Sequence, residues 1–263
     1  MNIRVRTLTA LLISLPHNGI AIPESIRARM SEAGRRVADT DWHVDQLYGF
    51  ARELGASILI PNFARYVVDL NRPRDGAALY PGQRETGLVP TVSFADEALY
   101  LAGAEPDQAE IAERVQHYWQ PYHDALSAEL ARLQSVHGRA VLWEGHSIRS
   151  QVPMLFDGRL PDLNMGTAGG ESCDAALQSK LAAVLQQQNR YSHVVNGRFK
   201  GGYITRHYGR PAQLVSAVQM EIAQCAYMDE DSFQYRPALA AQLQPLLRDL
   251  LMLTVSQEDS LRS

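Results

Sequence analysis

The stretch LLISLPHNGI, residues 11–20, is an apolar run that ends in a turn-forming sequence carrying His17. A strand with this ending delivers an imidazole to the rim of a sheet, where α/β proteins tend to keep their chemistry. The alternative is an ordinary turn after the strand. Because the apolar run begins further back, in TLTALLISL, we interpret residues 7–15 as the first strand of an α/β fold.

Arg4 and Arg6 precede this run, which gives the N-terminus a faint likeness to a signal peptide. The run is short, no small-residue cleavage site follows it, and it leads directly to His17. We therefore expect a strand and a cytoplasmic protein rather than a secreted one. Because no stretch approaches the ~20 apolar residues of a membrane span, we expect no membrane partner.

The composition favours one globular domain over residues 1–263. With 46% hydrophobic residues, a chain of this length can bury one substantial core. The net charge of −4, with no basic tail or stripe, argues against a nucleic-acid partner. The two cysteines, Cys173 and Cys225, have no Cys-x-x-Cys spacing, which suits a reducing compartment.

Helical and strand patterns alternate along the chain. Helices are predicted at residues 23–36, 39–56, 107–136 with an interruption at Pro121, 173–188, and from residue 231 onwards. Further strands are predicted at residues 57–62, 64–70, 140–147 and 213–222. This alternation, without a linker-like change of composition, predicts a single α/β domain with a mixed, mostly parallel sheet and helices on both faces.

Two of the eight histidines, His17 and His146, lie where predicted strands end. A catalytic zinc needs about three histidine or carboxylate ligands, and Asp41 or Asp45 would complete such a set. We expect these two aspartates one turn apart near the start of the helix predicted at residues 39–56. Hydrogen-bonded structural histidines and a helix N-cap at Asp41 are the alternatives that need no metal.

Arginines gather around another predicted strand end, in RYVVDLNRPRD, residues 65–75. Arg65 and Arg72 could clamp a carboxylate through guanidinium forks, with Asp69 and Asn71 beside them. A strand edge with solvated charges is the alternative interpretation.

Three more basic residues lie in motifs further along the chain. Arg149 comes two residues after the predicted strand that carries His146, in GHSIRS, where Ser147 is also present. Lys200 and Arg206 lie in FKGGYITRHYG, which we interpret as a flexible loop that could close over an anion.

Glu221 lies among apolar residues in AVQMEIAQCAYM, residues 217–228. A carboxylate there is either costly to bury or has a task, unless strand alternation places it on a solvated face. Near a metal it could take a proton from water and pass it to a leaving amine.

Seven blocks of this chain, in the same order, resemble the N-formylglutamate amidohydrolase family over nearly the whole length. They are ISLPHNG, DTDWHVDQLY, RYVVDLNRPRD, LWEGHSIRS, LPDLNMGT, FKGGYITRHYG and QMEIAQCAYM. The resemblance implies a zinc carboxypeptidase-like fold of the phosphorylase/hydrolase-like type and one domain of this family over residues 1–263. It also implies one Zn²⁺ per chain, or another divalent transition metal, and hydrolysis of N-formyl-L-glutamate to formate and L-glutamate in histidine degradation.

The resemblance also implies roles for single residues. His17 and His146 would be metal ligands, and Glu221 would be the general base. Arg65 would bind a carboxylate or the oxyanion. The substrate carboxylates would be held by Asn71 and Arg72, with Arg149, Lys200 and Arg206 as further binding residues.

One position departs from the wider superfamily, whose members carry a glutamate ligand three residues after the first histidine. Here that residue is Ile20, so the carboxylate ligand must come from elsewhere. We prefer Asp41 and keep Asp45 as the alternative, because the start of the predicted helix should lie nearer the strand ends.

Three other functions fit the same residues. The site could hydrolyse another N-acyl acidic amino acid, such as N-succinylglutamate, or only bind acidic amino acids without catalysis. A serine hydrolase that uses Ser147 is disfavoured, because GHSIR lacks the Gly-x-Ser-x-Gly elbow.

Overall fold

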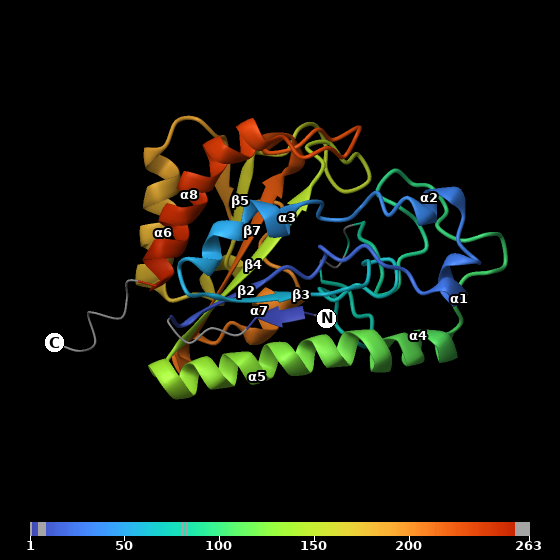
Figure 1. Ribbon diagram of the computed structural model, residues 1–263, viewed down its shortest axis with the longest axis horizontal. Coiled ribbons are helices and arrows are strands. Elements are labelled where there is room, and N and C mark those ends of the chain that lie inside the picture. The colour runs from blue at the N-terminus through green and yellow to red at the C-terminus, as the bar shows by residue number, and fades with distance from the viewer. Residues whose placement is uncertain (1, 5–8, 80–81, 83, 256–263) are drawn as a thin grey trace.

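In the computed structural model, which describes residues 2–4, 9–79, 82 and 84–255, seven strands form one central sheet (Figure 1). Their order across the sheet is β1-β3-β2-β4-β7-β5-β6. The strands are β1 (Asn2–Arg4), β2 (Leu11–Ser14), β3 (Ser57–Ile60), β4 (Ala140–Ile148), β5 (Leu163–Gly166), β6 (His193–Val195) and β7 (Val215–Ala223). The predicted first strand is β2; Thr7 and Leu8 lie outside the described residues.

The sheet is mixed and mostly parallel, as predicted. Strands β3, β2, β4 and β7 are mutually parallel neighbours, and β5 is parallel to β6. The antiparallel pairs are β1 with β3 and β5 with β7. Because β2, β3, β4 and β7 run the same way, their carboxyl ends meet at one edge, where ligands bind in open α/β sheets.

Helices cover both faces of the sheet, which confirms the predicted layering (Figure 1). Helices α6 and α8 pack on one face, and α5 and α7 on the other. The helices are α1 (Glu24–Arg27), α2 (Glu32–Arg35), α3 (Val44–Leu47), α4 (Gln108–Arg114), α5 (Gln120–His137), α6 (Ala175–Gln187), α7 (Tyr203–Tyr208) and α8 (Pro237–Val255).

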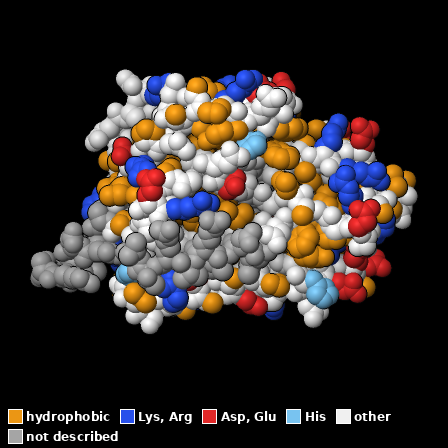
Figure 2. All heavy atoms as spheres, viewed as in Figure 1, with side chains coloured by type: hydrophobic (Ala, Val, Ile, Leu, Met, Phe, Trp, Pro, Cys, Tyr) orange, Lys and Arg blue, Asp and Glu red, His pale blue; other side chains and the backbone are white. Residues whose placement is uncertain are grey.

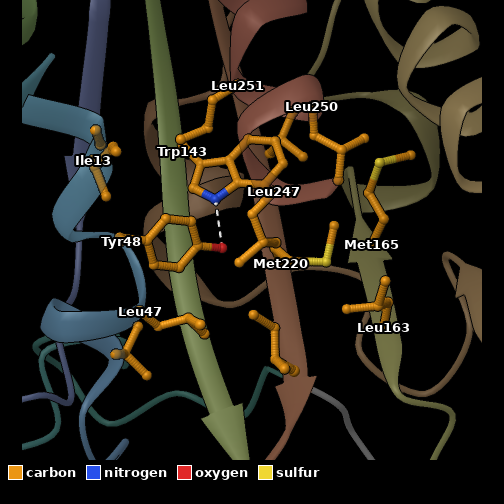
Figure 3. Packing of buried hydrophobic residues seen from close by; sticks show 14 of the residues in the cluster. Ile13, Leu47, Tyr48, Trp143, Leu163, Met165, Met220, Leu247, Leu250 and Leu251 are labelled. Carbon is orange, nitrogen blue, oxygen red and sulfur yellow. Dashed lines mark hydrogen bonds between the residues drawn. The ribbon is translucent and has the colours of Figure 1, made fainter. Parts of the chain in front are cut away.

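The side chains of β4 alternate between two hydrophobic clusters. Val141 and Trp143 point to the cluster that contains α6 and α8, where Trp143 packs near Leu247 and donates its indole N–H to Tyr48 at 3.0 Å (Figure 3). Ala140 and Leu142 point to the other cluster, with α5. Since successive strand residues alternate, Glu144 and His146 continue the row of Leu142.

The prediction of a strand at residues 64–70 is wrong. This segment forms turns, with the Val67 N–H donating to the Ala64 carbonyl at 2.9 Å. Its apolar residues divide between two cores: Tyr66 and Val67 lie in one cluster, and Val68 lies in another. Consecutive residues of a strand point to opposite faces, but Tyr66 and Val67 lie in the same cluster, so this segment lacks the alternation of a strand.

The helices predicted at residues 23–36 and 39–56 are much shorter in the structure. Two one-turn helices, α1 and α2, replace the first, and a bridge from Met30 to Tyr100 separates them. In the second, the left-handed backbone of His43 (φ 62°) precedes α3. Asp41 therefore lies before the helix and not one turn from Asp45 within it.

The other predicted helices need smaller corrections. The backbone stays helical through Pro121, because a π turn at Val115–Trp119 precedes it and the Gln120 N–H donates to the Val115 carbonyl. The C-terminal helix begins at Pro237 rather than at residue 231. The segment FKGGYITRHYG is not wholly a loop, since α7 occupies Tyr203–Tyr208.

The surface carries both signs of charge. Figure 2 shows basic and acidic side chains interspersed on the face that it draws. Among the described residues, no helix combines the length and the apolar character needed to cross a bilayer.

We expect Leu247→Ala in α8 to lower the free energy of unfolding by roughly 2–5 kcal/mol, because it leaves a cavity in a packed core. Leu247 is 0% exposed, whereas Leu239 of the same helix is 38% exposed and serves as the matched control. Leu239→Ala should cost less than about 0.5 kcal/mol. Urea denaturation measures both, and equal losses would contradict this assignment of the buried face of α8.

Candidate active site

Two histidine rings and one carboxylate meet at the carboxyl edge of the sheet. His17 follows β2, and His146 is the seventh residue of β4. Asp41 Oδ2 lies 2.9 Å from Nδ1 of His146 and 3.8 Å from Nδ1 of His17. Their ligand atoms lie within 4.8 Å of one another, and all three residues are buried. The structure thus brings together the three residues predicted as metal ligands.

Asn18 and Gly19 explain the turn that follows the first strand. The Asn18 side-chain amide donates to the Asp41 carbonyl at 3.2 Å and accepts from the Asp45 N–H at 3.2 Å. The Asp41 N–H itself donates to the His17 carbonyl at 3.0 Å. A Cβ at Gly19 would lie 2.2 Å from the Phe63 carbonyl oxygen, so only glycine permits this approach. The turn therefore presents His17 and also fixes Asp41 beside it.

Each histidine is held from behind by a second carboxylate. His17 Nε2 lies 2.7 Å from Asp69 Oδ1, and His146 Nε2 lies 2.7 Å from Glu144 Oε1. Each of these carboxylates accepts a hydrogen bond from an Nε2–H group, and both Nδ1 atoms face Asp41. Two imidazole nitrogens and one carboxylate oxygen form a donor set suited to a catalytic transition metal, and this arrangement can hold such an ion.

The two histidines have opposite protonation tendencies. Burial and the charge of Arg65 lower the pKa of His17. Burial also opposes a charged His146, but the carboxylates of Glu144 and Asp41 outweigh it and raise the pKa of His146 well above its usual value. A metal ion would have to displace that proton, so metal binding at this site is coupled to proton release.

Glu221 lies on β7 directly beside His146 in the strand register and is 7% exposed. Paired residues on neighbouring parallel strands point to the same face, so its carboxylate lines the same pocket. Burial, with the negative charge of Asp41, raises the pKa of Glu221 to about 8, although His146 acts in the opposite direction. A buried carboxyl group with a raised pKa is a stronger base than an ordinary glutamate, which suits a group that takes up and returns a proton.

Arg65 is buried at the inner side of the pocket. Its Nη2 lies 2.6 Å from Asp69 Oδ2, and its guanidinium lies over the Phe94 ring at 4.9 Å. For Asp69, burial is outweighed by the charges of Arg65 and His17, which hold its pKa well below the usual value. Arg65 therefore places a positive charge in the pocket and orients the carboxylate that holds His17.

The hydrogen-bond acceptors of Arg72 are neutral oxygens. Among the described residues, its guanidinium donates to the Thr86 carbonyl at 2.9 Å, the Asn71 carbonyl at 3.2 Å and the Thr86 hydroxyl at 3.4 Å. These bonds fix its direction, and its charge also helps to lower the pKa of Asp69. Arg72 is thus oriented to attract an anion into the pocket.

Asn71 lies between His146 and α7. Its Oδ1 accepts from the Ile204 N–H at 2.9 Å, and its Nδ2 lies 3.0 Å from His146 Nε2. A Cβ at Gly202 would lie 2.2 Å from this Nδ2, so the second glycine of FKGGYITRHYG leaves room for the amide. This motif therefore serves close packing beside the pocket rather than an open loop.

Three predicted binding residues are not among the described residues that line the pocket. Arg149 donates to the Glu230 carbonyl and the Asp231 carboxylate, each at 2.7 Å. Arg206, on α7, donates to the Gly201 carbonyl at 2.8 Å, and Lys200 is exposed. Asp45, the alternative metal ligand, is also exposed and lies outside the His17, Asp41 and His146 group.

The site contains residues that the sequence analysis did not predict: Gln219 lines the pocket, and Glu144 lies behind His146. Glu144 and Gln219 each lie two positions before a predicted site residue on the same strand, so alternation with period two could have identified them. Thr205 donates to the other oxygen of Glu144. Arg198 lines the pocket from the segment after β6, with its Nε donating to the Leu155 carbonyl at 3.0 Å. No local pattern indicates Arg198, because only folding brings its segment to the pocket.

Comparisons with known proteins agree with the family resemblance of the sequence blocks. A family model described as N-formylglutamate amidohydrolase matches residues 9–228. The N-formylglutamate deformylase of Pseudomonas aeruginosa is 52% identical over 242 residues, which covers 92% of this chain and 91% of that protein. The N-formylglutamate deformylase of Pseudomonas putida is 49% identical over 242 residues, with 92% and 90% covered.

A solved structure has the same fold. The crystal structure of an N-formylglutamate amidohydrolase from Ralstonia eutropha JMP134 matches with a TM-score of 0.81, covering 99% of this chain and 97% of that one. Its 24% sequence identity limits this likeness to the fold. The family model and the two curated relatives cover most of the sequence, and on that basis the chain belongs to the N-formylglutamate amidohydrolase family.

Proposed function

We propose that this chain is a zinc-dependent hydrolase that converts N-formyl-L-glutamate to formate and L-glutamate. The observation that carries the proposal is the meeting of His17, Asp41 and His146 with Glu221 in one buried pocket. Membership of the N-formylglutamate amidohydrolase family supports the choice of substrate. Following the same family resemblance, we place the reaction in histidine degradation in the cytoplasm.

The donor set supports one zinc ion per chain. His17, His146 and Asp41 would hold it, and the same nitrogen and oxygen donors would accept another divalent transition metal. When bound, the ion would supply Lewis-acid polarisation of the formyl carbonyl and a lowered pKa for water. Asp69 and Glu144 would keep both imidazoles in the tautomer that ligation requires.

The cations of the pocket suit a substrate with two carboxylates. We assign one carboxylate to Arg72 and Asn71, because Arg72 is oriented by bonds to neutral oxygens. We assign the other to Arg198, which lines the same pocket and takes the place that the sequence suggested for Arg149, Lys200 and Arg206. Since the formyl group is small, most of the binding energy must come from these contacts.

Glu221 is the proton carrier of the proposed reaction. It accepts a proton from the attacking water and returns it to the nitrogen of glutamate as the amide bond breaks. Burial raises its pKa, which favours uptake of the proton from water. Arg65 contributes positive charge toward the oxygen that becomes negative in the tetrahedral transition state, and such stabilisation is often the largest catalytic contribution.

Formate release tests the proposal directly. Purified protein is assayed with N-formyl-L-glutamate, with N-succinyl-L-glutamate as the competing substrate, before and after chelation. We expect formate release that chelation abolishes and Zn²⁺ restores. A faster reaction with N-succinyl-L-glutamate would indicate a different acyl specificity, and binding without turnover would indicate a binding protein. Either result would overturn the proposal.

We expect Asp41→Ala to lose the metal and Asp45→Ala to retain it. Asp41 Oδ2 faces both Nδ1 atoms, whereas the Asp45 side chain is exposed and its backbone N–H donates to Asn18 Oδ1. Metal analysis of the purified variants should give about one zinc per chain for Asp45→Ala and far less for Asp41→Ala. Full occupancy in Asp41→Ala would remove this residue from the metal site.

We expect Glu221→Gln to lower turnover by about 10²- to 10⁴-fold, because the amide keeps the shape of the side chain but cannot accept the proton. Zinc content and KM should remain close to the wild-type values.

Glu129→Gln is the matched control for this variant. Glu129, on α5, is also buried, at 3% exposure, but it accepts from the Ser57 hydroxyl of β3 and does not line the pocket. Its turnover should be unchanged. A fully active Glu221→Gln protein would show that another group activates the water, and loss of zinc would point to a ligand role.

A further inference from the structure

The carbonyl groups of Leu70, Asn71 and Arg72 are all bound from outside this segment, although it has no regular secondary structure. His123 Nε2 lies 2.9 Å from the Leu70 carbonyl oxygen, and the Trp119 indole N–H donates to the Arg72 carbonyl at 2.9 Å. The Tyr203 N–H donates to the Asn71 carbonyl at 3.4 Å. The peptide planes that carry Asn71 and Arg72 are therefore held from both sides.

His123 is fixed in one tautomer by its surroundings. A carbonyl can only accept, so Nε2 carries the proton, and Nδ1 lies 2.9 Å from the Tyr208 hydroxyl. The ring stacks on Trp119, with centroids 3.6 Å apart, and the ring of Tyr208 lies nearly parallel to it with centroids 5.8 Å apart. Trp119 and His123 are 4% and 3% exposed. Both donors are thus immobilised by packing and cannot easily turn to another acceptor.

The π turn at Val115–Trp119 brings a third donor into line. Arg114 Nη1 donates to the Val67 carbonyl at 3.1 Å, so one continuous helical rod binds the carbonyls of Val67, Leu70 and Arg72. In a regular α-helix, residues five apart point about 140° away from each other. A π turn closes on the fifth residue and sets Arg114 and Trp119 on one side of the rod. The π turn thus allows Arg114 and Trp119 to bind the segment that carries Asn71 and Arg72.

We propose that Trp119 and His123 are positioning residues that orient Asn71 and Arg72 for substrate binding. The proposal rests on the role assigned above to Asn71 and Arg72. Arg72 uses Nη1 on the Asn71 carbonyl, so a tilt of either peptide plane moves the guanidinium and its support together. Neither Trp119 nor His123 lines the pocket or lies beside His17, Asp41 or His146 in the described part of the chain. Their loss should therefore weaken substrate binding and leave the chemical step intact.

Trp119→Phe is the first test, because it removes the indole N–H and keeps an aromatic ring in place. The KM for N-formyl-L-glutamate should rise roughly five- to tenfold, with kcat and zinc content unchanged.

Trp143→Phe is the matched control for Trp119→Phe. Trp143 is also buried, and its indole N–H donates to Tyr48 in the other hydrophobic cluster. Its KM should be unchanged. An unchanged KM in Trp119→Phe, or an equal rise in both variants, would overturn the proposal.

Two substitutions of His123 separate positioning from packing. Gln can place its amide N–H where Nε2 lies, whereas Asn reaches only the position of Nδ1. His123→Gln should therefore keep a KM near that of the wild type, and His123→Asn should raise it with kcat unchanged. Equal KM values in the two variants would overturn the role of the Leu70 hydrogen bond.

Hydrogen exchange gives a readout that does not depend on the substrate. Exchange of peptides covering residues 66–76 should be faster in Trp119→Phe than in the wild type and unchanged in Trp143→Phe. If the wild type releases no formate but this difference is found, the proposed function fails while the anchoring of the segment stands. If formate is released and exchange is unchanged in Trp119→Phe, the positioning proposal fails alone.

Discussion

One oxygen of Asp41 faces the Nδ1 atoms of two histidines that are distant in the sequence, and the arrangement of the pocket depends on this meeting. The two rings lie with centroids 4.8 Å apart, both almost wholly buried. Two buried imidazole rings need a hydrogen-bonding partner, because a buried polar group without one is costly. Asp41 supplies it, and so ties the end of β2, the end of β4 and the segment before α3 into one geometry.

Two chains of buried polar groups converge on that oxygen. One runs from Arg65 through Asp69 to His17, and the other runs from Thr205 through Glu144 to His146. Each buried charge has a partner, and removing one member would leave another charge unpaired in a dry environment. The imidazole orientations are therefore set by the protein itself, so a ligand entering the pocket would meet a preorganised site.

The sheet decides where the packed core ends and the pocket begins. On β4, Leu142 packs against the cluster that contains α5, while Glu144 and His146 continue the same row beyond it. Helix α7 forms the border: Ile204 belongs to the hydrophobic cluster, and Thr205 already bonds to Glu144. On one face of β4, the residues thus change from core packing to site residues within two positions. The short helix α7 covers this boundary.

Local patterns in the sequence were sufficient to predict which residues lie at or near the ends of strands. His17, His146 and Glu221 follow or end apolar runs, and the parallel order of β2, β4 and β7 brings their carboxyl ends together. The mixed sheet with helices on both faces also followed from alternating periodicity. These features depend on whether each residue is buried or exposed, which a local pattern records.

Other features depended on which residues from distant segments come into contact. Helical spacing placed Asp41 and Asp45 on one helix, but the left-handed backbone at His43 separates them, and only Asp41 reaches the histidines. The apolar residues after β3 looked like a strand, yet the consecutive residues Tyr66 and Val67 pack in the same cluster. Arg198 reaches the pocket although nothing around it in the sequence predicts this. A hydrophobic pattern in the sequence indicates which residues are buried, but it does not indicate which other residues they contact. Those contacts were decided only when segments distant in the sequence packed together.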